Sequence, residues 1–219
     1  MSPMPPRMRV AADTFAVRVC PQGRLEVLLV ERRNEPFQGS WALPGGFVEL
    51  DEDLPDAAAR ELREETDLRP AVLDQVGAWG TPGRDPRWRT VSAVYVAVVR
   101  PGEDEARGGD DAVRAAWHRL DELPRLAFDH DIIMPAALEH LRRRCEATHL
   151  AFGLVPEAFS GAHLARALRA LGSLDPPSDA LRLTEAADLE PAGAPALRRL
   201  SHGRLLRSLH RALVLFPTR

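Results

Sequence analysis

The chain has 219 residues, of which 45% are hydrophobic and 28% are charged, and its formal net charge is −3. This composition allows a buried core, and the slightly negative charge excludes a generally basic nucleic-acid binder. All 29 basic residues are arginine, which we attribute to the codon usage of a GC-rich genome rather than to function.

The sequence shows no sign of a secretory or membrane destination. The segment Met1–Val10 lacks the apolar stretch of a signal peptide, and no apolar run approaches the roughly 20 residues that a membrane helix needs. Cys20 and Cys145 have neither metal-ligand nor redox spacing and fit a reducing compartment. We therefore expect a cytoplasmic protein that does not contact membranes.

Strand-like stretches alternate with helical patterns over the first two thirds of the chain. The expected strands are residues 14–19, 25–31, 40–47, 72–80, 89–99 and 111–120. A helix is expected after Asp53, which suits an N-cap, with Pro55 in its first turn. A second helix is expected over Asp129–Ala147, because apolar residues recur along one stripe. This alternation predicts an α/β fold.

The chain changes character near residue 150. Residues 1–149 carry 20 arginines and 26 acidic residues, whereas residues 150–219 carry nine arginines and six acidic residues. A helix is expected over residues 160–172, with Ser160 as its N-cap and Gly172 ending it. Residues 178–189 and 200–213 suit further helices. We therefore expect two domains, 1–149 and 150–219, the second small and mainly α-helical.

Three glutamates are concentrated in the first predicted helix. Glu61, Glu64 and Glu65 have i, i+3, i+4 spacing, so their side chains share one helix face. Like charges this close repel one another unless a cation lies among them, and carboxylate oxygens suit Mg²⁺ or Mn²⁺. Gly45 and Gly46 precede the helix and would let the backbone approach such a metal closely, with a carbonyl as a further ligand.

The ordinary alternative is a solvated acidic face whose arginines pair with the glutamates. The stretch 46–68, however, resembles the signature of the Nudix hydrolase family, G-x5-E-x7-R-E-U-x-E-E-x-G-U, where U is a bulky aliphatic residue. The matching residues are Gly46, Glu52, Arg60, Glu61, Leu62, Glu64, Glu65 and Leu68. Asp67 replaces the final glycine, at a position that ends the helix and needs a positive φ angle, which Asp tolerates.

This resemblance implies a Nudix α/β/α sandwich that hydrolyses a nucleoside diphosphate linked to another group, with Mg²⁺ or Mn²⁺ as cofactor. It implies that Glu61, Glu64 and Glu65 hold the metal with help from the Gly45 carbonyl. It also assigns catalytic roles to Glu64, Glu65 and Arg60.

Two further roles concern Arg60 and Glu65. Arg60 lies next to Glu61 and can pair with Glu52, which would tie the preceding loop to the helix. The resemblance implies that Glu65 is the group that orients or deprotonates the attacking water. In parts of the family this base lies outside the signature, and Asp110 and Asp111 are then the candidates; an ordinary solvated acidic loop is the alternative for these two residues.

A second stretch, residues 79–98, concerns the substrate. It resembles the R-D-P-R segment of ADP-ribose pyrophosphatases and of the Nudix-type regulators that sense ADP-ribose. Arg84 and Arg87 can each donate two hydrogen bonds to phosphate or ribose oxygens. Asp85 can orient an arginine or bind a ribose hydroxyl. The expected substrate is ADP-ribose or a related ADP-sugar; a Pro-Gly loop with surface arginines remains the alternative.

Two neighbouring positions bear on the same pocket. Trp88 stands where the subgroup has a small residue, and it either narrows the pocket or stacks on a base. Residues 127–133 also resemble the subgroup and include His130. A lone histidine is more typical of a cap or a packed side chain than of a catalyst.

Residues 149–172 resemble the winged-helix domain that follows the Nudix domain in transcriptional regulators of NAD metabolism. The candidate DNA-reading helix, residues 178–190, carries one arginine against four acidic residues, which would repel phosphates. The basic residues come later, in the acid-free segment 196–219. We therefore expect a hydrolase that forms a homodimer, with a DNA-binding, ADP-ribose-sensing regulator as the second possibility.

Overall fold

The structure is a computed structural model that describes residues 8–102, 112–147, 149–173, 179–180, 183, 189–191 and 197–199. The strands before residue 120 are β1 Met8–Val19, β2 Leu25–Arg32, β3 Trp41–Ala42, β4 Gly45–Phe47, β5 Val72–Trp79, β6 Arg89–Val98 and β7 Ala112–Arg119. The helices are α1 Leu54–Thr66, α2 His130–Ala147 and α3 Gly161–Ala170, with a 3-10 helix, η1, at His149–Leu154. Three short strands follow α2, namely β8 Ala158–Phe159, β9 Leu189–Pro191 and β10 Leu197–Arg199.

The main sheet is mixed and is organised around β1. Strands β1 and β6 are parallel, with register from Met8 opposite Arg89 to Val17 opposite Val98. On its other edge β1 is antiparallel to β2 and to β4, while β5 pairs with β6 and β3 and β7 pair with β2. The α/β fold predicted from the sequence is thus confirmed.

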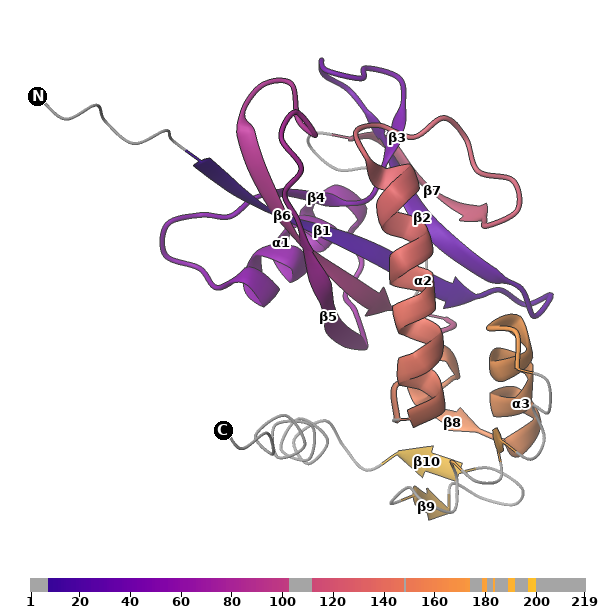
Figure 1. The fold of residues 1–219 in the computed structure, drawn as a ribbon. Helices are drawn as coiled ribbons and strands as arrows, with labels where there is room; N and C mark the ends of the chain where they lie inside the picture. Colours follow the sequence, from indigo (N-terminus) through magenta and orange to yellow (C-terminus); the bar gives the residue numbers. More distant parts are fainter. Residues whose placement is uncertain are drawn as a thin grey trace, which may run out of the picture.

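The two faces of this sheet are covered by different helices. Phe15 and Val17 belong to a hydrophobic cluster with α2, whereas Ala16 packs in a separate cluster that contains Leu62 of α1. The same alternation runs through β2 and β6, as the period of two residues in a strand requires. The sheet therefore lies between α1 and α2 (Figure 1).

The third predicted strand is divided in two. Residues 40–47 were expected to form one strand, but β3 pairs with β2 and β4 pairs with β1. Pro44 lies at the division; it has no N–H to offer a sheet, and its carbonyl accepts the Thr14 N–H at 2.8 Å. The division brings Gly45 and Gly46 beside the middle of β1.

The ends of α1 are as predicted. The Asp53 carboxylate accepts a hydrogen bond from the Leu54 N–H at 2.8 Å, and a proline occupies the first turn. Asp67 has φ of 60° in the left-handed region, and its N–H donates to the Arg63 carbonyl at 2.8 Å. An aspartate thus fills the position where the signature has glycine.

Helix α2 links the sheet to the part of the chain after residue 150. Its apolar stripe lies in the same hydrophobic cluster as Phe152, Phe159 and Leu164. Near its end, the Arg142 Nε donates to the Leu171 carbonyl at the end of α3, at 2.8 Å. Figure 1 shows α2 running from the sheet toward β8 and α3.

The second part of the chain differs in one respect from the mainly helical domain expected from its sequence. Helix α3 is present, but β8, β10 and β9 form a small antiparallel sheet that the sequence analysis did not predict. Of the helix expected over residues 178–189, Asp179, Ala180 and Leu183 are helical; the one expected over residues 200–213 lies outside the described residues. Within the described ranges, no helix combines the length and apolarity that crossing a membrane requires.

Replacing Asp67 tests the end of α1. We expect Asp67→Gly to raise the free energy of unfolding by about 0.5–1 kcal/mol, because glycine adopts a positive φ without the cost that a side chain carries there. Asp67→Ala should lower it, since alanine has no polar group to ease the left-handed conformation. Urea denaturation of both variants measures the difference; stabilisation by alanine would contradict this explanation.

Candidate active site

Arg60, on α1, is the centre of the charged cluster. Its Nε and Nη2 atoms donate to the two carboxylate oxygens of Glu52, at 2.9 and 2.7 Å. Its Nη1 atom donates to Glu61 at 2.9 Å and to Glu64 at 3.1 Å. Nη2 also reaches the Phe47 carbonyl at 3.3 Å. One guanidinium therefore fixes both the loop before α1 and two of the three predicted metal ligands, and the predicted Arg60–Glu52 pair is present.

The third glutamate has a different partner. The Glu65 Oε2 atom accepts the Gly45 N–H at 3.0 Å, so α1 and β4 are joined at this point. Glu61 and Glu65 line a cleft of about 340 Å³, and Gly45 and Gly46 form part of its wall. The Glu64 side chain, 48% exposed, is not among the residues that line this cleft.

Both glycines are needed for this close approach. A Cβ atom on Gly46 would lie 2.3 Å from the Glu61 Oε1 atom. A Cβ atom on Gly45 would lie 2.4 Å from the Ala12 carbonyl oxygen and 2.7 Å from the Asp13 Oδ1 atom. Any side chain at either position would displace the acidic groups around it.

The carboxylates around Arg60 differ in their proton affinities. The hydrogen bond from Arg60 lowers the pKa of Glu52 to about 2. Burial raises the pKa of Glu61 above its usual value, although Arg60 opposes the shift. Glu61 is thus a largely buried carboxylate whose charge depends on a nearby cation.

A second charged group, centred on Arg84, also lines the cleft. The Arg84 guanidinium donates to both carboxylate oxygens of Asp129, at 3.0 and 2.7 Å, and its Nη2 lies 3.5 Å from Asp13 Oδ2. The Arg84 side chain is only 5% exposed. Arg84 was predicted to bind substrate; in the structure it lines the cleft while joining its loop to β1 and to the start of α2.

Asp85 and Arg87 form a separate pair in the same loop. The two Asp85 oxygens accept from Arg87 Nε and Nη2 at 3.0 and 2.8 Å, and Oδ1 also accepts the Arg87 backbone N–H at 2.9 Å. These hydrogen bonds outweigh the effect of burial and hold the pKa of Asp85 below its usual value. Arg87 is 38% exposed and lines the cleft, so its orientation is fixed while its guanidinium faces solvent.

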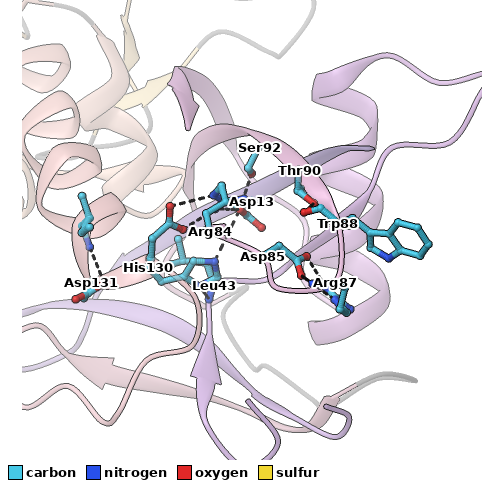
Figure 2. Close-up of polar contacts among 12 residues, drawn as sticks. Asp13, Leu43, Arg84, Asp85, Arg87, Trp88, Thr90, Ser92, His130 and Asp131 are labelled. Atoms are coloured by element: carbon cyan, nitrogen blue, oxygen red, sulfur yellow. Dashed lines mark hydrogen bonds and ion pairs between the residues drawn. The ribbon is translucent and has the colours of Figure 1, made fainter. Parts of the chain in front are cut away.

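Asp13 is a cleft residue that the sequence analysis missed. It lies in the middle of β1 and is 7% exposed, and its Oδ2 atom accepts the Ser92 hydroxyl as well as Arg84. The signal in the sequence was a single acidic residue within the mainly apolar stretch 10–17, because a charge at such a position is rarely buried without a partner. Figure 2 shows Asp13 beside Arg84 and His130.

The imidazole of His130 is buried under the cleft. Its Nδ1 atom accepts the Leu43 backbone N–H at 2.9 Å, and the side chain is 3% exposed. Burial lowers the pKa of His130, although Asp13 opposes the shift. The sequence analysis favoured a capping or packed histidine, and the bond to Leu43 fits that description.

Two other predictions concern residues that are not among those described as lining this cleft. Trp88 is 48% exposed, points away from the Asp13–Arg84 group in Figure 2, and is not among the cleft-lining residues. The Arg9 guanidinium stacks on its ring, 4.8 Å from the centroid. Asp110 and Asp111 lie outside the described residues, so their proposed role as a base stays a prediction.

The oxygen atoms of the cleft fit a hard divalent cation by chemistry, although they do not form a preassembled cluster. Glu61 and Glu65 present carboxylates beside closely approaching backbone, and the Arg60 guanidinium pairs with the three carboxylates of Glu52, Glu61 and Glu64. Among the described residues, no three His, Cys, Asp or Glu side chains are grouped as metal ligands. The reason is that Arg60 and the Gly45 N–H hold the glutamates.

Comparison with known proteins places this geometry in a family. A model of the NUDIX domain matches residues 10–139. The ADP-ribose pyrophosphatase of Methanocaldococcus jannaschii is 47% identical over 109 residues, 50% of this chain and 63% of that protein. The ADPR responsive transcriptional repressor NtrR of Acinetobacter baylyi is 34% identical over 161 residues, 71% of this chain and 62% of that protein. The match thus spans slightly under two thirds of each relative.

Solved structures extend the similarity over more of the chain. The crystal structure of NrtR from Shewanella oneidensis has a TM-score of 0.74 and 27% identity, covering 88% of this chain and 94% of that one. The NUDIX domain of that protein complexed with ADP ribose has a TM-score of 0.57 and 31% identity, covering 62% and 89%. Its complex with a 27mer DNA has a TM-score of 0.70 and 26% identity, covering 88% and 93%.

Removing the Arg60 charge tests the electrostatics of the cluster. We expect Arg60→Met to lower the free energy of unfolding at pH 7.5 by about 2–3 kcal/mol, because Glu61 would remain buried without its cation. The loss should be smaller at pH 5: the folded-state pKa of Glu61 lies above its unfolded value, so lowering the pH toward that unfolded value protonates the buried group and relieves the penalty.

Arg63→Met is the matched control, because Arg63 is on the same helix, is 50% exposed and lies 3.9 Å from Glu64. It should change stability by less than about 0.5 kcal/mol. Urea denaturation at both pH values measures all three proteins. Equal losses from Arg60→Met at both pH values, or equal losses from the two substitutions, would contradict the account.

Proposed function

This chain belongs to the Nudix family, and from that premise we propose that it is a hydrolase that cleaves the diphosphate of a nucleoside diphosphate derivative, with ADP-ribose or a related ADP-sugar as substrate. The observation that carries the proposal is that two glutamates of α1, Glu61 and Glu65, line the same cleft as the Arg87 guanidinium. An acidic wall that suits a metal and a cationic group for phosphate are the two requirements of diphosphate hydrolysis.

A divalent cation, Mg²⁺ or Mn²⁺, is part of this proposal. Glu61, Glu64 and Glu65 would hold it, with the Gly45 carbonyl as a further ligand. When bound, it supplies positive charge that neutralises the diphosphate oxygens. The proposal is supported by the excess of carboxylates over guanidinium groups around Arg60 and by the burial of Glu61, which makes its negative charge costly without a cation.

Three residues orient the attacking water, the glutamates or the substrate. Glu65, oriented by the Gly45 N–H, is the acceptor for a proton of the attacking water. Arg60 acts indirectly, by holding Glu61 and the loop at Phe47 in place. Asp85 fixes the orientation of Arg87 through two hydrogen bonds, and the Arg87 guanidinium donates to the substrate's phosphate oxygens.

Similar proteins support ADP-ribose as the substrate. The relative with 47% identity is an ADP-ribose pyrophosphatase, and the NUDIX domain of Shewanella oneidensis NrtR has been crystallised with ADP ribose. Of the two arginines predicted to bind the substrate, we assign that contact to Arg87, because its side chain is 38% exposed and pairs with one carboxylate, whereas Arg84 is 5% exposed and contacts two.

The hydrolase proposal predicts that either Glu61→Gln or Glu65→Gln lowers turnover of ADP-ribose with Mg²⁺ at least about a hundredfold. Each substitution removes one carboxylate charge where negative charge develops in the transition state. Glu139→Gln, at an exposed position of α2, is the control and should turn over as wild type does. The assay is release of phosphate from the products by a phosphatase; near-normal rates in both cleft variants would reject the assignment.

A second function is favoured by the part of the chain after residue 150. The similarity to Shewanella oneidensis NrtR covers 88% of this chain, well beyond the matched NUDIX domain, and one structure of that protein contains DNA. The boundary near residue 150 would then separate a catalytic or sensing domain, 1–149, from a winged-helix-like domain, 150–219. In this second candidate, ADP-ribose in the cleft controls DNA binding by a homodimer.

The composition of the candidate DNA-reading segment, residues 178–190, weighs against strong DNA binding, because it has one arginine against four acidic residues. We expect no complex with the chain's own upstream DNA at physiological salt, and only weak, salt-sensitive binding at low salt, as contacts to phosphates alone give. Deleting residues 196–219 should abolish that weak binding, because this segment contains basic residues and no acidic ones. A fluorescence anisotropy titration, with and without ADP-ribose, measures DNA binding by the full-length chain and by the deletion variant. A tight complex that ADP-ribose dissociates would make the regulator the first candidate.

A further inference from the structure

We propose that Asp13 and His130 form a hydroxyl-binding subsite in the wall of the cleft, which takes the sugar attached beyond the diphosphate of the substrate. The proposal rests on the proposed function for the diphosphate itself. It goes further by assigning two residues, neither part of the Nudix signature, to the recognition of a hydroxylated group.

The first step is the hydrogen-bonding state of His130. Its Nδ1 atom accepts the Leu43 N–H, so Nδ1 carries a lone pair and not a proton. A neutral imidazole then bears its proton on Nε2. Burial favours this neutral form, because it lowers the pKa of the ring. The backbone of Leu43 therefore fixes one tautomer, with Nε2 as a donor.

The second step is the position of that donor. Nε2 lies 3.8 Å from the Asp13 Oδ2 atom, which is beyond hydrogen-bond distance. Both residues line the cleft, and both are buried. An oxygen atom can sit at about 2.8 Å from each of two atoms with this separation, so a donor and an acceptor are presented together to one ligand atom.

The third step is the chemistry of the ligand atom. A hydroxyl accepts from the Nε2–H group and donates to the carboxylate at the same time. A phosphate oxygen only accepts, and the Asp13 charge would repel it. The pair therefore selects a neutral hydroxyl rather than another phosphate group.

Asp13 is held rigidly for this role. Its Oδ2 atom accepts the Ser92 hydroxyl and approaches the Arg84 Nη2 (Figure 2). Arg84 is fixed in turn by its hydrogen bonds to Asp129. This arrangement makes Arg84 a positioning residue.

The subsite is contiguous with the acidic wall. Gly45 donates its N–H to Glu65, and the Asp13 Oδ1 atom lies against the Cα of the same glycine, where a Cβ would be 2.7 Å away. A ligand whose diphosphate lies at Glu61 and Glu65 thus brings its next chemical group against Asp13. In ADP-ribose that group is the terminal ribose, which carries hydroxyls.

The test compares ADP-ribose with ADP, which lacks the terminal sugar. His130→Asn is the informative variant, because the asparagine carbonyl can still accept the Leu43 N–H while the Nε2–H donor is lost. The full-length chain is titrated calorimetrically in the presence of a chelator, so that neither ligand is hydrolysed. We expect His130→Asn to lower the affinity for ADP-ribose about three- to tenfold and to leave the affinity for ADP unchanged.

Arg87→Ala is the matched comparison, since a contact to phosphate serves both ligands and should weaken both. The proposal would be overturned if His130→Asn lowered the affinities for ADP and ADP-ribose equally, or lowered neither. Thermal unfolding checks that the variant is folded. If it is not, wild-type chain is titrated with ADP-ribose analogues that lack one hydroxyl of the terminal ribose in turn; at least one should bind three- to tenfold more weakly, and full affinity for every analogue overturns the proposal.

The binding measurement is independent of hydrolysis. Wild-type chain that binds ADP-ribose but does not cleave it would reject the proposed function and leave the subsite standing. Wild-type chain that cleaves ADP-ribose but binds it no better than ADP would reject the subsite alone.

Discussion

The Arg60 guanidinium is the contact on which the acidic wall of the cleft depends. It binds Glu52 through two hydrogen bonds, Glu61 and Glu64 through one each, and the Phe47 carbonyl through another. Without this cation, the Glu52 carboxylate and the Phe47 carbonyl would lose their contacts to α1, and adjacent carboxylates would repel one another. The spacing of the signature is therefore a constraint on charge balance as well as on metal ligands.

The second charged group of the cleft, around Arg84, also depends on one guanidinium held by two carboxylates. Arg84 lies between Asp13 and Asp129, so residues from β1, the loop before β6 and the segment entering α2 are joined in one buried charge network. Breaking such a network by removing one member costs several kcal/mol, because the remaining charge stays buried. This cost explains why Arg84 stays paired within the protein, whereas Arg87, in the same loop, is more exposed.

The sequence predicted correctly those features of the structure that depend on residues close together in the chain. The period-two strands, the Asp53 cap, the positive φ at Asp67 and the Arg60–Glu52 pair all follow from neighbouring residues, and each was predicted. Asp13 was not, because its partners come from distant strands and from a loop more than 70 residues away. The short strands after residue 150 were also missed, since two- and three-residue strands carry too little pattern to be distinguished from loops.

The central claim is that the cleft hydrolyses a phosphoric anhydride of a nucleoside diphosphate derivative. Phosphorus NMR of the full-length chain with ADP-ribose and Mg²⁺ tests it directly, because the two diphosphate signals and the phosphate monoester signals are separate. The account predicts loss of the diphosphate signals and growth of two monoester signals, from AMP and ribose 5-phosphate. Diphosphate signals that persist at a saturating ligand concentration, with Mg²⁺ and with Mn²⁺, would contradict it.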